Sequence, residues 1–453
     1  MNRFAFGGVG QLLSAAMAAV CFCVSPAWGQ CVGDCNDDGF VEIDELLVGV
    51  GIALGEQEPD ACFAFDGDFS GDVTISELVA AVNNAISDCR GSPPPTPVPD
   101  PVLGGAPGYF RYGDVRKTNS ELANAVAKFP DDPSANLYYA LTRVFTRFFD
   151  DSRLKDLLRR TGITVRGGSG NVCELEFNPP HPFPDNAPRS GEMIAAMQEV
   201  MGPEIQAALE NLQAIPADVN IRFDLKNLPN CFCPPIDVDI AEIDLADVKA
   251  VESGLRTLAA VLDLLGAYDL DADSKLAVDG THREVLEGNS NLLTLRSAAA
   301  LGSGRAGLDQ ALSLASQVID LIRKETDDQS DDVLIIRPED ADGAAKLQRI
   351  IDLVRQSLHG EVTVPVDVVT GEVVLMDIGL LGQERLNLDL LFSGGFASLR
   401  QFLPAFNAKG MLDSTRFPDP TFGGMTPDLT QDKINRFFSE SHYKISTPDE
   451  CSN

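Results

Sequence analysis

Two segments near the start of the chain carry oxygen-bearing side chains at a spacing suited to a hard cation. Asp34 and Asp66 begin these segments 32 residues apart, and Gly39 and Gly71 each follow five residues later. Calcium accepts a crowded oxygen shell, in which a glycine at position 6 allows a sharp turn and a glutamate at position 12 supplies two oxygens. The predicted ligands are Asp34, Asn36, Asp38, Phe40 (backbone carbonyl), Glu42 and Glu45 in the first loop, and Asp66, Asp68, Ser70, Asp72 (backbone carbonyl), Thr74 and Glu77 in the second.

The repeat continues into the residues that must position these loops. Each loop runs into a segment with apolar residues four apart, a spacing that lines one face of a helix. The matched apolar residues are Leu46, Val50 and Leu54 in the first copy and Leu78, Val82 and Ile86 in the second. We therefore expect two loop–helix units with apolar faces.

The two units resemble the EF-hand family, and the resemblance covers roughly residues 31–90. The short helices and the 32-residue spacing are similar to those of a dockerin, a calcium-dependent docking module of secreted carbohydrate-degrading assemblies. This resemblance implies two bound calcium ions and a cohesin-like or other cell-surface protein partner. The chain differs from the usual dockerin pattern in its position-12 residues Glu45 and Glu77, its N-terminal module and its four cysteines.

The charge of this module indicates what the ions would do. Residues 30–90 contain 14 acidic residues and one basic residue, a net charge of −13. Two calcium ions would neutralise part of this charge where it is densest, so we expect a structural role for the ions. The first loop should bind more tightly, because Glu42 adds a carboxylate there while Ser70 replaces one in the second loop.

The first 29 residues indicate export. Arg3 precedes an apolar run from Leu12 to Val24, and Ala27-Trp28-Gly29 supplies small residues for cleavage. This pattern predicts a signal peptide over residues 1–29, with an uncleaved anchor as the alternative. We expect the protein outside the cell or at its surface, or in a periplasm. No later stretch is apolar for long enough to span a membrane.

Eight cysteines remain after the predicted cleavage, and an even number in an exported chain predicts disulfides of open connectivity. They are Cys31, Cys35, Cys62, Cys89, Cys173, Cys231, Cys233 and Cys451. Cys231-Phe232-Cys233 could instead be half of a metal site.

A proline-rich linker over residues 91–105 separates the module from a larger domain over residues 106–453. The dense prolines favour an extended, semi-rigid spacer. The whole chain has a net charge of −33, so it would repel phosphate backbones, which argues against nucleic-acid binding.

The larger domain shows mainly helical periodicity. Predicted helices cover residues 120–128, 133–148, 192–213, 244–265 (with Asp244 as N-cap), 308–322 and 347–358. Alternating patterns predict strands at residues 219–225, 236–240 and 386–390 and a hairpin over residues 364–378 that turns at Thr370-Gly371. The predicted fold class is mainly α: a small paired EF-hand (dockerin-like) domain and a larger, mostly helical domain with minor antiparallel hairpins.

Motifs in the larger domain give weaker indications of chemistry. The histidines are dispersed, so we expect surface or packing roles for His181, His282, His359 and His442. Residues 302–307 fit a dinucleotide-binding glycine pattern, but they follow a helix-like stretch, so we expect a turn between helices. The acidic residues at 269–273 start like a third calcium loop but lack its glycine and closing glutamate, and those at 327–332 predict a solvated loop. The aromatic-proline tail over residues 417–424 should pack on the domain.

The prediction is therefore a secreted calcium-binding protein, not an enzyme, with no catalytic residues assigned. Its dockerin-like module is tethered to a helical binding or scaffold domain. The alternative is an exported hydrolase, acting for instance on polysaccharides and docked through the same module.

Overall fold

The structure is a computed structural model. It describes residues 32–35, 41–54, 57, 61–65, 73–87, 101–103, 106, 115–161, 163–165, 175–177, 183–224, 240–325, 332, 334–336, 341–364, 384–394 and 396–440. The predicted signal peptide and nearly all of the predicted linker lie outside these residues, as does the predicted turn at Thr370-Gly371.

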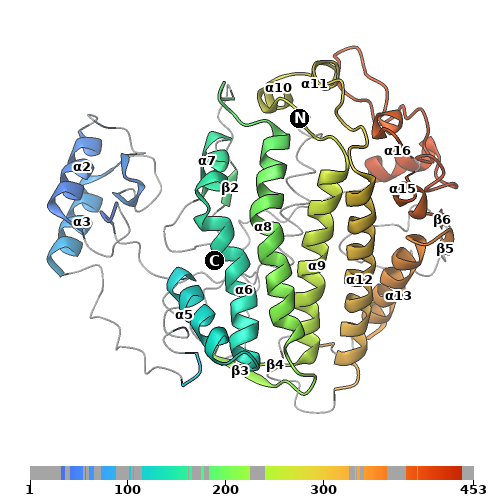
Figure 1. Ribbon diagram of the computed structural model, residues 1–453. Coiled ribbons are helices and arrows are strands. Elements are labelled where there is room, and N and C mark those ends of the chain that lie inside the picture. Colours follow the sequence, from blue (N-terminus) through green and yellow to red (C-terminus); the bar gives the residue numbers. More distant parts are fainter. Residues whose placement is uncertain are drawn as a thin grey trace.

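The described residues of the N-terminal module form two helices and a short 3-10 turn between them (Figure 1). Its elements are α2 (Ile43–Ala53), η2 (Phe63–Phe65) and α3 (Ile75–Ser87). Its small core is built around the fully buried ring of Phe65, with Ile52, Cys62 and Ala81. Gly49 is required on α2, because a Cβ there would lie 2.2 Å from Phe65 Cε1.

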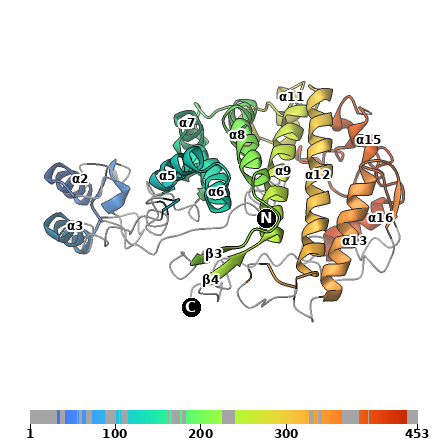
Figure 2. The same ribbon diagram turned by 60° about the horizontal axis from the view of Figure 1, so that its bottom comes forward.

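The larger domain is built on a row of long helices that run side by side (Figures 1 and 2). Neighbouring pairs in this row pack closely, with the most extensive contact between the helices over Leu245–Ala267 and Ala298–Ile322. The row is α5 (Val115–Lys128), α6 (Pro133–Asp150), α8 (Ser190–Gln213), α9 (Leu245–Ala267), α12 (Ala298–Ile322) and α13 (Ala341–Ser357).

Side-chain caps begin several of these helices. Asp132 accepts the Ala135 N–H (2.9 Å) at the start of α6, where Pro133 occupies the first helical position. Asp244 accepts the Ala246 N–H (2.7 Å) and caps α9, as predicted. Ser297 caps α12 in the same way.

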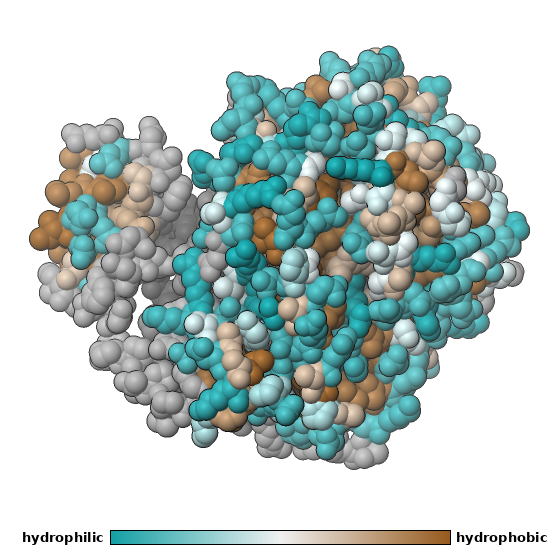
Figure 3. All heavy atoms as spheres, viewed as in Figure 1, coloured by the Kyte–Doolittle hydropathy of each residue, from teal (hydrophilic) through white to brown (hydrophobic). Residues whose placement is uncertain are grey.

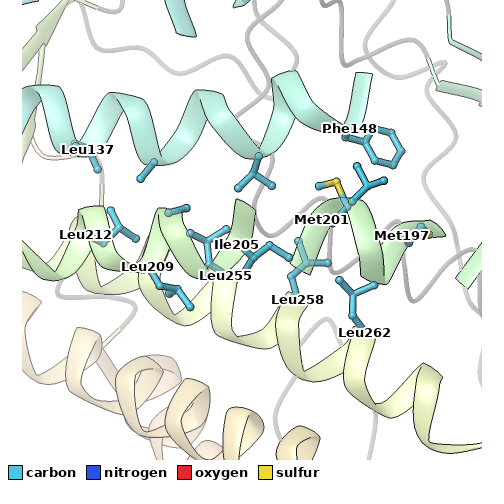
Figure 4. Close-up of a cluster of buried hydrophobic side chains, with 14 of the residues drawn as sticks. Leu137, Phe148, Met197, Met201, Ile205, Leu209, Leu212, Leu255, Leu258 and Leu262 are labelled. Carbon is cyan, nitrogen blue, oxygen red and sulfur yellow. The ribbon is translucent and has the colours of Figure 1, made fainter. Parts of the chain in front are cut away.

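The main core lies where α6, α8 and α9 meet (Figure 4). The apolar side chains in this core point from the three helices toward one another. Figure 4 labels Leu137 and Phe148 of α6, Met197, Met201, Ile205, Leu209 and Leu212 of α8, and Leu255, Leu258 and Leu262 of α9. Across the other face of α9, Gly304 of α12 approaches Ala260 and Leu264 closely.

In the part of the chain that the structure describes, the strands form three small antiparallel pairs. They are β1 (Ile163–Val165) with β2 (Leu175–Phe177), β3 (Ile221–Asp224) with β4 (Ile240–Ile243), and β5 (Val362–Val364) with β6 (Glu384–Leu386). In Figure 2 the ribbon of β3 and β4 crosses one end of the helix row.

Shorter elements complete the larger domain. They are α7 (Ser152–Arg160), α10 (Ser274–Asp279), α11 (His282–Gly288), α15 (Asp389–Phe392), η6 (Leu399–Phe402) and α16 (Gln431–Glu440). The aromatic tail packs on this domain as predicted: the Phe417 and Phe422 rings lie 5.4 Å apart, and Phe422 lies 6.3 Å from Phe402.

The mainly helical class with small antiparallel sheets is confirmed, and three local predictions are wrong. Residues 302–307 lie inside α12 and form no turn, because the helix starts at Ala298 behind its Ser297 cap. Only the first part of 386–390 is a strand, since Leu390 belongs to α15. The solvated loop predicted at 327–332 is wrong at Asp332, which is half-buried and bridges to Glu242, whereas Asp327, Asp328 and Asp331 lie outside the described residues.

Within the described part of the chain, no helix is both long and apolar enough to cross a membrane.

Candidate metal centre

The two predicted position-12 glutamates occupy the same place in the two helices of the module. Glu45 is the third residue of α2 and Glu77 is the third residue of α3. At this position a carboxylate can turn back to the start of its helix, where backbone N–H groups have no helical partner. The first turn of each helix therefore holds its glutamate next to the loop that precedes it.

In the first copy, backbone N–H groups on two sides orient the Glu45 carboxylate. Its Oε2 accepts the Glu42 N–H (2.8 Å), and its Oε1 accepts the Cys35 N–H (2.9 Å). Cys35 directly follows Asp34, so the second bond brings position 12 of the predicted loop beside position 1. Asp34 and Glu45 are both buried, with exposed fractions of 8% and 5%.

In the second copy, Glu77 makes a capping box with Thr74. Its Oε2 accepts the Thr74 N–H (2.7 Å) and the Thr74 hydroxyl (2.8 Å), and its exposed fraction is 7%. Thr281 and Glu284 of α11 make the same two bonds, at 2.7 and 2.9 Å, yet Glu284 is exposed. The capping box alone therefore does not explain why Glu77 is buried.

Contacts across the module hold the first loop against the second helix. Gly33, at φ +103°, accommodates a close approach, because a Cβ there would lie 2.6 Å from that of Ala81. Its N–H donates to the Ala64 carbonyl (2.9 Å), and the Asn84 amide donates to the Val32 carbonyl (3.0 Å). These contacts hold Val32 and Gly33, which directly precede Asp34, against η2 and α3.

A disulfide between Cys35 and Cys62 adds a covalent link to this loop, with the Cα atoms 5.1 Å apart. This is one of the pairings that the cysteine count allows. Cys31 and Cys89 lie outside the described residues.

Five of the twelve predicted ligands lie in the described residues: Asp34, Glu42, Glu45, Thr74 and Glu77. The other seven, Asn36, Asp38, Phe40, Asp66, Asp68, Ser70 and Asp72, lie outside them. The structure thus brings Asp34 and Glu45 together, whereas the Glu42 and Thr74 side chains are exposed. Among the described residues, no group of three or more His, Cys, Asp or Glu side chains is positioned to hold a metal ion.

The donors that are described fit a hard cation. They are carboxylate and hydroxyl oxygens, and the neighbouring Cys35 sulfur is bonded to Cys62 and so is no thiolate. Oxygen donors of this kind suit calcium, whereas zinc and copper sites use imidazole and thiolate.

The structure also shows a surface that the sequence did not predict. One face of α2 and the matching face of α3 are apolar and exposed, with exposed fractions between 42% and 81%. This apolar stripe consists of Ile43, Leu47 and Val50 on α2, Leu54 at the C-cap of α2, and Ile75, Val79 and Val82 on α3. The predicted apolar face is thus exposed at Val50, Leu54 and Val82, because Phe65 and Ile52 fill the small core.

The stripe residues recur at the same places in both copies, since Ile43, Leu47 and Val50 each have an apolar partner 32 residues later. Figure 3 shows apolar surface over α2 and α3. In the sequence, both helices carry apolar residues on more than one face. Such a helix either packs against a second surface or leaves one apolar face exposed to solvent.

The polar residues singled out in the larger domain make structural contacts. His282 Nδ1 accepts the Leu412 N–H (3.0 Å), and His359 Nε2 lies 2.9 Å from Asp309 Oδ1. Asp271 pairs with Arg189 (2.8 Å), and Asp273 caps α10. His181 and His442 lie outside the described residues, as do Cys231 and Cys233.

No family model, curated protein or solved structure matches the chain.

Proposed function

We propose that residues 30–90 form a dockerin-like pair of EF-hands that binds two calcium ions and docks the helical domain to a protein partner outside the cell. The observation that carries this proposal is the burial of Glu45 and Glu77 at the same position of both repeats. Buried carboxylates are rare unless a cation or strong hydrogen bonds compensate them. Both glutamates stand at position 12 of the predicted loops, where an EF-hand places its bidentate calcium ligand, and this supports one calcium site in each loop.

The ions would act mainly on stability. Extracellular modules of this type bind calcium at roughly 10⁻⁴–10⁻³ M. At about 100 times the dissociation constant, each ion adds about 2.7 kcal/mol to the free energy of unfolding. A module of this size has a small core, so two such ions and a disulfide would supply much of its stability.

The apolar stripe supports docking as the purpose of the module. Large exposed apolar patches on soluble proteins mark interaction sites. The α2 and α3 stripes lie on a unit with almost no basic residues, so a partner with an apolar centre and basic rim would complement it. The larger domain is then the docked binding or scaffold unit, in which His282, His359 and Asp271 make structural contacts.

Calorimetry on the chelator-treated full chain tests calcium binding. We expect two ions for the wild type, one for Glu45→Gln and one for Glu77→Gln, with the tighter site lost in Glu45→Gln. Glu284→Gln is the matched control, because it removes a glutamate with the same capping bonds and should leave both ions bound. Two ions in all variants would contradict the proposal, and retention of the tighter site in Glu45→Gln would contradict the order of affinities.

A second experiment separates docking from stability. The full chain is used as bait in culture medium with calcium or with a chelator, and Leu47→Glu combined with Val79→Glu tests the stripe. We expect calcium-dependent capture that the double variant loses while it still binds two ions. Capture that is independent of calcium and of the stripe would refute docking through this face.

A further inference from the structure

The disulfide between Cys35 and Cys62 links the start of the first predicted calcium loop to the core of the module. Cys35 directly follows Asp34, the expected position-1 ligand, and its N–H donates to Oε1 of Glu45, the expected position-12 ligand (2.9 Å). Cys62 has an exposed fraction of 4% and belongs to the same core as the buried ring of Phe65. The disulfide therefore ties the backbone group that orients Glu45 to a buried point of the module.

Other contacts hold the chain on the opposite side of Asp34. Hydrogen bonds of Val32 and Gly33 fix the two residues before it. On the side after Asp34, Cys35 is held by its bond to Glu45 and by the disulfide. Breaking the disulfide removes the covalent hold on this side, and the like charges of Asp34 and Glu45 then oppose their approach until a cation binds.

The second copy of the repeat has no cysteine at the matching place. Gly67 stands there, 32 residues after Cys35. The Glu77 carboxylate accepts the N–H and the hydroxyl of Thr74, which belongs to the start of the same helix. The disulfide thus breaks the symmetry of the repeat and acts on the first site.

We propose that the Cys35–Cys62 disulfide positions the first calcium loop, so that its formation raises and its reduction lowers the affinity of that loop for calcium. This inference rests on the proposed calcium binding of the module. Reduction by a dithiol breaks the Sγ–Sγ bond, gives two electrons and two protons to the two sulfurs as thiols, and converts the dithiol to a cyclic disulfide. Disulfides persist in oxidising compartments, so in an exported chain the first site reaches full affinity outside the cell.

Two single-site variants of the full chain allow calorimetry to measure the effect at each site. Glu77→Gln retains the first site, and Glu45→Gln retains the second. Cys35→Ser combined with Cys62→Ala is added to each variant, with alanine at residue 62 because that place is buried. We expect the cysteine substitutions to weaken calcium binding about tenfold in Glu77→Gln, a typical size for coupling between two sites, and less than about twofold in Glu45→Gln.

The comparison of the two sites separates positioning from general stability. Equal weakening of both sites would indicate a module that is merely destabilised and would overturn this inference, as would an unchanged affinity at the first site. In both cases the proposed calcium function still stands. A wild-type chain that binds no calcium would instead refute the proposed function, and this inference with it.

The redox equilibrium of the wild-type chain tests the same coupling even if the cysteine variants do not fold. The chain is equilibrated with mixtures of reduced and oxidised dithiothreitol, its thiols are alkylated, and the peptides that contain Cys35 and Cys62 are quantified by mass spectrometry. Because coupling is reciprocal, saturating calcium should shift this equilibrium about tenfold toward the disulfide in the wild type and should not do so in Glu45→Gln. Absence of the shift in the wild type, or an equal shift in Glu45→Gln, would contradict the inference.

Discussion

Two glycines of α12, two residues apart, should respond in opposite ways to the same substitution. A Cβ at Gly302 would have no atom within 4 Å. A Cβ at Gly304 would lie 2.8 Å from Leu264 Cγ and 3.2 Å from the Ala260 carbonyl oxygen. The pair therefore separates the helix propensity of glycine from its role in packing α12 against α9.

The magnitudes follow from these contacts. Alanine stabilises a helix by about 1 kcal/mol relative to glycine, so Gly302→Ala should raise the free energy of unfolding by about that amount. Gly304→Ala has the same gain, but forcing a methyl group into a packed interface costs about 1–3 kcal/mol. Leu264 can rotate away, whereas the Ala260 carbonyl belongs to the backbone of α9. The two variants should thus differ by about 1–3 kcal/mol, with Gly304→Ala less stable.

Urea unfolding of the full chain at constant calcium, followed by far-ultraviolet circular dichroism, measures this difference. We expect the midpoints of the two variants to move apart without a change in the slope of the transition. Equal midpoints would refute the close contact between α12 and α9, and with it the explanation of the glycine pattern as a helix-packing feature.

Three further predictions concern single side chains. Burial lowers the pKa of His282 below its ordinary value of 6.5, so neutral His282 accepts the Leu412 N–H above that pH and loses this bond as the pH falls through the lowered pKa. Amide exchange at Leu412 should then accelerate by more than the pH dependence of the intrinsic exchange rate accounts for. Unchanged protection of this amide in acid would contradict the prediction. Gly49→Ala places a methyl group against the Phe65 ring and should cost the module about 1–3 kcal/mol or more, which calorimetry would show as a lower melting temperature for the module with the larger domain unaffected. Glu252→Gln removes a buried carboxylate that pairs with Lys249 and Arg256, and it should lower the free energy of unfolding in urea by about 1–3 kcal/mol at neutral pH. The ion pairs lower the pKa of Glu252, so their stabilising effect, and with it the difference between variant and wild type, should disappear as the pH falls through this lowered pKa. A difference that persists in acid would exclude the ion pairs as its cause.

Local signals in the sequence were sufficient for the long helices. Asp244 was predicted as the cap of α9 and makes the capping bonds, because capping depends on residues within one turn. The pattern at 386–390 was ambiguous, since a short apolar alternation suits a strand as well as a short helix. The turn predicted at residues 302–307 is wrong because of tertiary packing. Glycine favours a turn locally, but Gly304 lies within α12, where its lack of a side chain allows α12 to pack closely on α9.

The candidate sites likewise combine features that local sequence predicts with features that depend on residues distant in sequence. The repeat predicted where the carboxylates of Glu45 and Glu77 would lie along the chain, and both are buried at the start of a helix. It did not predict which face of α2 and α3 would be exposed, because that depends on Phe65 from the segment between them.

Native mass spectrometry of the full chain, first treated with chelator and then supplied with calcium, tests the central claim most directly. The account predicts a mass increase of two calcium ions in the wild type and in Glu284→Gln, and of one ion in Glu45→Gln and in Glu77→Gln. A wild-type chain that gains no calcium, or variants of Glu45 and Glu77 that gain as many ions as the wild type, would contradict it.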